Sequence, residues 1–263
     1  MRIDFRQFKK IGNRIMENGE KSFQKLFDIL ELIASRNEPR TVHDIAEELS
    51  LPESTVYRIL KYLAKRNYIE RTPQGIFLGS GCLHLGIMAQ EQNVLQRVAH
   101  SDLLRLAEIT METAHLAKFH GDAIVYIDKC DGARNIRMGS MIGRNSPLYC
   151  TGIGKAMLAA LPDKELEERL RSMKLKRYTE NTICSIDNLR AELEETRRRG
   201  YAIDNCEHEE GVYCIAAAVL DSRGKVAAGL SIAGMSVTMK DKTESLAKKV
   251  CETARRISRK LGN

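Results

Sequence analysis

The sequence predicts a mixed α/β fold in two domains, and three observations lead to this prediction. Apolar residues recur at helical spacing in three segments between residues 22 and 66, and two short strand-like runs follow them. Beyond residue 99, strand-like runs mix with amphipathic helices. The 263 residues suffice for one small and one medium-sized domain. We expect four segments in order: an N-terminal arm over 1–20, a trihelical domain with a hairpin over 21–80, a linker helix over 81–98 and an α+β domain over 99–263.

The elements of the first domain follow from apolar spacing and capping residues. The first helix has an apolar face made of Phe23, Leu26, Phe27, Leu30 and Ile33. Thr41 is expected to cap a second, short helix, with Asp44 three residues further on. A third helix is expected from about Glu53 to Arg66. Residues 68–78 then predict a β-hairpin whose turn lies at 72–75.

Residues 42–61 fit a helix-turn-helix position by position. Ala46 supplies the small side chain where the two helices cross, and Val56 and Ile59 supply core contacts of the second helix. Ser50 stands in the turn, where this motif prefers glycine because glycine readily adopts a positive φ. The outward face of the second helix is then expected to carry a polar set: Ser54, Thr55, Tyr57, Arg58 and Lys61.

This outward set suits contact with double-stranded DNA. The second helix of the motif enters the major groove with its N-terminus first, so Arg58 is the candidate for a bidentate contact to guanine. Ser54, Thr55 and Lys61 are candidates for phosphate contacts. Arg71, on the hairpin, is placed to reach a neighbouring groove or phosphate as part of a wing. A trihelical protein-interaction module is the alternative, and the hydroxyls and cations disfavour it.

The second domain shows strands and helices in irregular order. Strands are expected over 114–120, 123–130, 214–221 and 226–234, and helices over 99–113, 163–173, 187–200 and 241–261. Gly200 is expected to end the third of these helices as its C-cap residue.

Bulk composition narrows the class of protein. Hydrophobic residues make up 43% and charged residues 29%, as in soluble globular proteins, and the net charge of +7 is compatible with a polyanionic partner. The 7 cysteines are scattered and never form a C-x-x-C pair, which favours free thiols in a reducing cytoplasm. No apolar run approaches the ~18 residues of a membrane span, and the charged N-terminus is unlike a signal peptide. We expect a cytoplasmic protein without a cofactor or a bound metal.

Several segments resemble one family. LPESTVYRILKYLAKRNYI resembles the recognition-helix segment of the IclR family of transcriptional regulators. TAHLAKFHGDAIVYIDK, IGRNSPLYCTGIGKAMLA, and EHEEGVYCIAAAVLD followed by GLSIAG resemble motifs of its effector domain. The similarity runs from about residue 22 to 261 and is strongest to the branch that represses genes of pectin and sugar-acid breakdown. It implies a winged helix-turn-helix, a linker helix and a GAF-like effector domain with a curved antiparallel sheet, assembled as a homodimer or as a tetramer of two dimers.

The resemblance also implies a pocket for a small carboxylate effector. Gly152 and Ile153 match a loop whose backbone N–H groups face the ligand, which suits an anion at a helix N-terminus. Asp204, Cys214 and Ser231 match polar positions of the pocket. Val212 matches an apolar wall.

Five positions bear on which effector binds. Tyr213 stands where the family usually has arginine, Ala218 where proline is common, and Ala233 where some members have a hydroxyl. Asn135 and Arg137 are expected to extend the polar surface towards a longer sugar acid, or else to lie on a solvated strand face. These departures affect the expected effector and leave the expected fold unchanged.

Three other types of binding site do not match the residues found at the required spacing. The stretch TGIGKA lacks the glycine and hydroxyl of a phosphate-binding Walker loop, because Tyr149 and Ala156 stand there, and Met157 replaces a glycine of the dinucleotide fingerprint. Lys155 is therefore expected to be a structural or helix-surface cation. Cys206, His208 and Cys214 match no common zinc spacing.

The sequence thus predicts a transcriptional regulator of a carbon-catabolism operon, controlled by a small carboxylate such as a sugar acid. A cytosolic enzyme that acts on a small carboxylate through the second domain is the alternative. It would use Cys150 or Cys214 with a histidine, and neither cysteine has the sequence context of an activated nucleophile.

Overall fold

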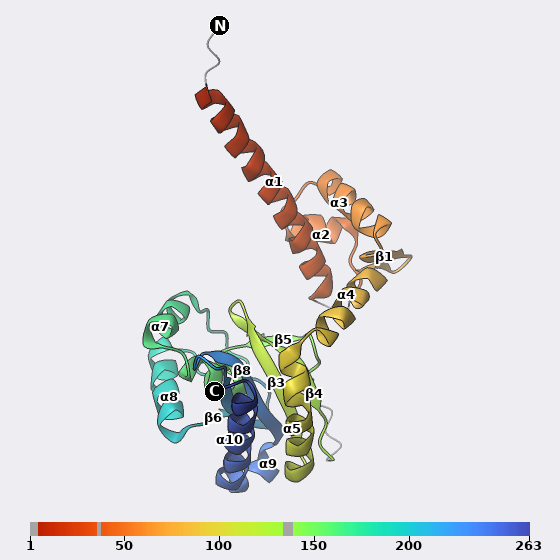
Figure 1. Cartoon of the computed structure of the whole chain (residues 1–263). Coiled ribbons are helices and arrows are strands. Elements are labelled where there is room, and N and C mark those ends of the chain that lie inside the picture. The colour runs from red at the N-terminus through yellow and green to blue at the C-terminus, as the bar shows by residue number, and fades with distance from the viewer. Residues whose placement is uncertain (1–4, 36–37, 134–138) are drawn as a thin grey trace. The chain divides into compact units, whose positions relative to one another are not determined.

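The computed structural model describes residues 5–35, 38–133 and 139–263 and has helices and antiparallel strands throughout (Figure 1). Two compact units follow one another along the chain, Met1–Gln92 and Asn93–Asn263. The first contains a helix-turn-helix with a hairpin and the second an antiparallel sheet with helices, so the predicted fold class is confirmed. In the part of the chain that the structure describes, no helix combines the length and apolar character needed to cross a membrane.

The first unit is helical apart from one hairpin. Its elements are α1 (Phe5–Ala34), α2 (Val42–Glu48), α3 (Glu53–Lys65), β1 (Ile69–Thr72), β2 (Gly75–Leu78) and α4 (Ser80–Glu91). Helix α1 continues through residue 20, where we expected an arm to end, and no proline interrupts the chain before Pro39. Helix α4 ends at Glu91 because Asn93 caps the next helix by accepting from the Gln96 N–H at 3.3 Å. The expected linker over 81–98 therefore spans parts of two helices.

The turn between α2 and α3 has the predicted features. Thr41 caps α2 in a capping box with Asp44. Ser50 adopts a φ of 51°, so a serine takes the left-handed conformation that glycine usually supplies in this motif. Beneath the turn, Val56 and Leu60 of α3 are fully buried in a core that also contains Ile45 of α2.

The second unit is one six-stranded antiparallel sheet with helices on both faces. The strand order is β5-β4-β3-β8-β7-β6. The strands are β3 (Thr113–His120), β4 (Ala123–Cys130), β5 (Asn145–Pro147), β6 (Ala202–Asn205), β7 (Val212–Leu220) and β8 (Val226–Met235). The helices are α5 (Val94–Thr110), α6 (Gly152–Ala159), α7 (Asp163–Ser172), α8 (Ile186–Arg199), α9 (Ser236–Met239), the 3-10 turn η1 (Lys240–Lys242) and α10 (Thr243–Lys260).

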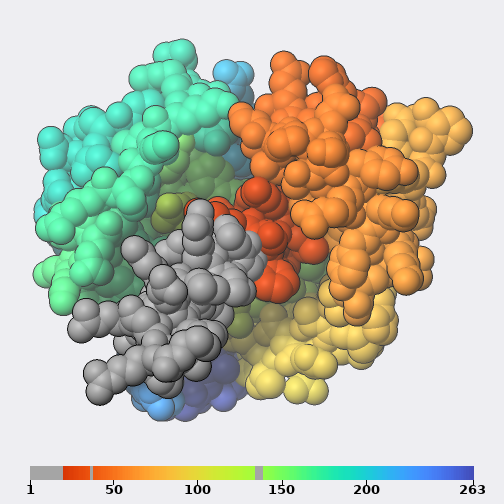
Figure 2. Space-filling model, turned by 90° about the horizontal axis from the view of Figure 1, so that it is seen from above, coloured from red at the N-terminus to blue at the C-terminus, as the bar shows by residue number. Residues whose placement is uncertain are grey.

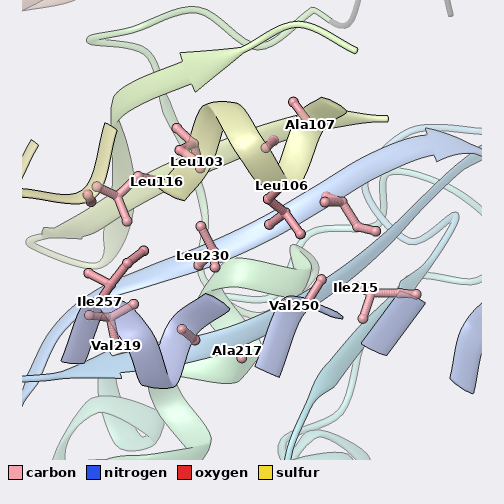
Figure 3. Close-up of a cluster of buried hydrophobic side chains, with 14 of the residues drawn as sticks. Leu103, Leu106, Ala107, Leu116, Ile215, Ala217, Val219, Leu230, Val250 and Ile257 are labelled. Carbon is pink, nitrogen blue, oxygen red and sulfur yellow. The ribbon is translucent and has the colours of Figure 1, made fainter. Parts of the chain in front are cut away.

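Alternation along β7 separates the two faces of the sheet. Ile215 and Ala217 belong to the core that β7 and β8 form with α5 and α10, where Leu106 and Val250 are fully buried (Figure 3). Ala216, between them in the chain, belongs to the core on the opposite face together with the residues of α6. Helix α6 therefore covers the sheet face towards which the even-numbered side chains of β7 point.

Helices α7 and α8 lie side by side on the surface of the second unit (Figures 1 and 2). Arg190 of α8 forms a two-pronged ion pair with Glu167 of α7, with both N–O distances at 3.1 Å. Gly200 ends α8 with a φ of 83°, as predicted for its C-cap. The chain then enters β6 directly, and this places Asp204 beside β7.

Candidate functional site

One face of α3 is polar and open to solvent. Ser54, Tyr57, Arg58 and Lys61 are exposed, and Thr55 is half-buried. These are the side chains that the sequence placed on the outward face, so the structure brings the five onto one side of a helix whose apolar side is buried. Their contacts with DNA remain a prediction.

The cations on this face are not neutralised by neighbouring acids. Among the described residues, none forms an ion pair with Arg58, Lys61 or Arg71. Arg71 of β1 lies over the Tyr57 ring of α3, with its guanidinium carbon 5.0 Å from the ring centroid. The hairpin and the polar face of α3 are thus joined by a cation–π contact.

A buried arginine holds the hairpin against α2. Arg40 is buried and forms an ion pair with Glu48 at the end of α2, and its backbone oxygen accepts from the Ile76 N–H at 2.9 Å. His43 and Glu53 link the start of α2 to the start of α3 at 2.9 Å, and this contact raises the pKa of the His43 imidazole. No pattern in the sequence indicates this role for Arg40, because buried arginines are rare and its partner lies eight residues away.

In the second unit, a small cavity of about 40 Å³ lies between the sheet and α6. Its described lining residues are His115, Tyr126, Gly139, Ser140, Thr151, Gly152, Ile153, Asp204, His208, Glu209, Val212, Cys214, Ser231 and Ala233. All six residues that the resemblance assigned to the effector pocket are among them. The structure thus brings together residues that lie up to 79 positions apart in sequence, from Gly152 to Ser231. Their role in effector binding remains a prediction.

Strand register explains why these side chains meet. Asp204 of β6 pairs with Cys214 of β7, which pairs with Ala233 of β8. In the next row, His115 of β3 pairs with Ser231 of β8. Paired residues on neighbouring strands point to the same face of a sheet, so these five line one floor.

The N-terminus of α6 closes the cavity from the other side. The Thr151 hydroxyl accepts from the Gly154 N–H at 3.2 Å and donates to the Pro147 oxygen at 2.7 Å. Helix geometry leaves the first N–H groups, on Gly152 and Ile153, without acceptors within the helix. A Cβ at Gly154 would lie 2.1 Å from the Leu148 oxygen, so only glycine fits there. The helix start is therefore fixed, and Gly152 and Ile153, whose N–H groups lack acceptors within the helix, line the cavity.

The cavity wall contains acids, neutral imidazoles and a thiol. Burial raises the pKa of Asp204 to about 7, although its Oδ1 accepts from the Glu207 N–H at 2.7 Å. Burial lowers the pKa of His115 to about 3, so this imidazole is neutral, and its Nε2 lies 2.7 Å from the Ser140 hydroxyl. Burial also raises the pKa of the Cys214 thiol. None of the described lining residues is a lysine or an arginine.

Lys155 lies just behind the cavity on α6. It is fully buried, and its Nζ lies 2.5 Å from Glu207 Oε1 and 3.4 Å from Glu192 Oε1. Of the two roles expected for it, the structural one applies, because a surface cation would be exposed.

Sequence reasoning did not assign seven of the described lining residues to the pocket: His115, Tyr126, Gly139, Ser140, Thr151, His208 and Glu209. Strand alternation puts His115 on the same face as Ser231, but only once β3 and β8 are known to pair. Tyr213, the departure from the family's usual arginine, does not line the cavity: it packs in the core on the other sheet face, where its hydroxyl lies 3.1 Å from the Thr243 hydroxyl.

Other expected positions lie elsewhere. Ala218 does not line the cavity, whereas Ala233 does. Asn135 and Arg137 lie outside the described residues. Within the described ranges, Cys206, His208 and Cys214 do not come together as a metal-ligand group.

Comparisons with known proteins agree with this architecture. The description "IclR helix-turn-helix domain" matches residues 22–73, and "Bacterial transcriptional regulator IclR C-terminal" matches residues 88–259. The regulator KdgR of Escherichia coli K12 is 36% identical over 92% of this chain and 92% of its own length. BhcR of Paracoccus denitrificans is 35% identical over 91% of this chain and 87% of its own length. The crystal structure of Thermotoga maritima IclR has a TM-score of 0.71 at 34% identity and covers 93% of this chain and 100% of that one.

These relatives are named as transcriptional regulators and not as enzymes. Both family descriptions match in the expected order, and together they span both units. The chain belongs to the IclR family of bacterial transcriptional regulators.

Proposed function

We propose that this regulator binds a specific operator of a carbon-catabolism operon and that a small carboxylate controls this binding from the cavity beside α6. It would act in the cytoplasm, where both DNA and metabolites are available. The observation that carries the proposal is the pairing of two free N–H groups at the start of α6 with a floor of protonatable side chains.

A carboxylate would bind in this cavity without a lysine or arginine among the described lining residues. The positive end of a helix dipole and its free N–H groups favour a carboxylate. Asp204 would oppose the anion when ionised, but its pKa of about 7 lets it take a proton and donate to the ligand. Ser231 and Cys214, paired to the neighbouring strands of the floor, offer further polar contacts.

The size of the cavity bears on the effector. A water molecule needs about 10–15 Å³ measured in this way, so 40 Å³ holds a few water-sized groups. A two- or three-carbon acid fits with small adjustments, whereas a six-carbon sugar acid requires the pocket to widen. We retain the small carboxylate as the class, with sugar acids as its larger members.

Operator binding is assigned to the polar face of α3 and to Arg71. One recognition helix contacts only a few base pairs, so a homodimer reading a palindrome is expected. Apolar side chains on α4 favour pairing, because Leu83 is 66% exposed and Leu85 53% exposed. A tetramer built from two such dimers is the larger form that we propose to test.

The test combines selection and ligand screening. Genomic fragments retained by the purified protein should share a palindrome, and sedimentation at micromolar concentration should show no stable monomer. A thermal-shift screen of two- to six-carbon carboxylates should then yield a ligand that changes operator affinity. Retention of fragments without a shared sequence would contradict the operator, whereas a screen without hits would contradict only the effector.

A further inference from the structure

Helix α5 and strand β4 bring together three side chains that neither DNA nor effector binding uses. His100 comes from α5, and Asp128 and Cys130 come from β4. Asp128 and Cys130 are two residues apart, so strand alternation points both to the face that α5 covers. We propose that His100, Asp128 and Cys130 form a binding site for a divalent transition-metal ion, with Zn²⁺ favoured.

The spacing of the three groups suits such an ion. One ligand atom from each residue lies within 4.8 Å of the others, and His100 Nδ1 is 2.8 Å from Asp128 Oδ2. Tetrahedral zinc, with bonds of about 2.0–2.3 Å, needs ligand atoms roughly 3–4 Å apart. Side-chain rotations that shift the ligand atoms by up to about 1 Å reach this arrangement.

Burial fits a site that opens on one side. The Asp128 side chain is 3% exposed and Cys130 is 6% exposed, whereas the His100 side chain is 54% exposed. The second oxygen of Asp128 accepts from the Lys129 N–H at 2.9 Å, which fixes the carboxylate. An ion would enter past His100 and keep a water molecule as its fourth ligand on that side.

The charge around the three side chains is negative, which favours a cation. The types of ligand atom then determine which metal ion fits. The carboxylates of Asp128, Asp131 and Glu108 place negative charge near the Cys130 thiol. The ammonium of the nearby Lys129 is paired with the Asp131 carboxylate at 3.0 Å. A nitrogen, an oxygen and a sulfur donor suit borderline metals such as Zn²⁺, whereas Mg²⁺ and Ca²⁺ prefer oxygen alone. Binding would move the imidazole proton to Nε2 and release the thiol proton to solvent, one proton per ion.

Cobalt reports the cysteine contact directly. Tag-free full-length protein, stripped with a chelator and reduced, is titrated with Co²⁺. We expect a near-ultraviolet sulfur-to-cobalt band that saturates at one equivalent and disappears when Zn²⁺ is added. Cys130→Ser should abolish the band, while Cys184→Ser, which changes an exposed cysteine elsewhere, should leave it unchanged. In competition with a chromophoric chelator, His100→Gln should weaken Zn²⁺ binding at least tenfold.

The alternative is a His–Asp pair that only stabilises the packing of α5. It predicts no band in the wild-type chain, and that result overturns the proposal. A band that survives Cys130→Ser also overturns it, as does a band lost in Cys214→Ser and kept in Cys130→Ser, which would put the metal in the effector pocket. Circular dichroism on each variant shows whether it is folded, and the band of a folded Cys130→Ser chain decides the question.

Discussion

Helices α3 and α6 both begin at a surface that we propose for recognition, but they present different parts of the chain to it. Helix α3 starts at Pro52 without a side-chain cap and displays long polar side chains to solvent. Helix α6 is capped by the Thr151 side chain and is buried along its length. Its first two residues, Gly152 and Ile153, line a small cavity. Under the proposed function, the contrast would let one chain bind two kinds of anion: exposed cations suit a polyanion in water, and fixed backbone dipoles suit a single carboxylate away from water.

The largest expected effect lies at the start of α6. Gly154→Ala places a methyl group 2.1 Å from the Leu148 oxygen, so we expect a loss of about 3 kcal/mol or more in the stability of the second unit. Gly152→Ala meets the Cys214 Cβ at 3.3 Å and should cost far less, while it weakens effector binding. Thermal and urea unfolding of both variants checks this. Equal stability of the two would mean that α6 is not held as described.

On α3, we expect substitutions of the exposed side chains to change DNA affinity and base preference. Arg58→Ala should cost about 1–3 kcal/mol at the operator and flatten base preference at one position. Lys61→Ala should weaken all sequences alike and lower the salt slope by about one. Titrations of operator and mutated operators at several salt concentrations separate the two. If Arg58→Ala kept both affinity and base preference, the docking of α3 would be wrong.

The pH dependence of effector binding tests the buried acid. A bound carboxylate favours protonated Asp204, whose pKa is about 7, so affinity should be constant below that pH. Above it the proton must be taken up on binding, and affinity should fall up to about tenfold per pH unit. His115 is neutral throughout this range and does not contribute. Calorimetry between pH 5.5 and 8.5 should show the fall, and Asp204→Asn should remove it; an equally steep fall in that variant would assign the proton elsewhere.

The smallest expected effect concerns the link between hairpin and helix. The Arg71–Tyr57 contact is exposed and should contribute about 0.5–1 kcal/mol. Tyr57→Leu removes the ring while keeping an apolar side chain, and Arg71→Gln removes the charge. A double-mutant cycle on operator affinity measures their coupling. Additive effects would show that Arg71 acts on DNA independently of Tyr57.

The first unit could be predicted more completely than the pocket. Capping at Thr41, the turn at Ser50 and the buried face of α3 depend on local spacing, which a sequence displays directly. The floor of the cavity depends on the pairing of β3 with β8, and no local pattern specifies that register. Hence the sequence did not indicate His115 as a lining residue, and it did not show that Tyr213, one residue from the lining position Cys214, points to the other face of the sheet.

The buried Lys155 has a mechanical consequence for sensing. Its ammonium ties α6 to Glu207, three residues beyond Asp204, and to Glu192 of α8. Separating these segments would leave a charge unpaired in the interior, which typically costs several kcal/mol. The wall made by α6 and the end of β6 is therefore held together, and we expect any widening for a ligand to occur in lining segments that Lys155 does not hold. If the proposed effector binds here, larger carboxylates would be distinguished by how far they displace the part of the lining that Lys155 leaves untied.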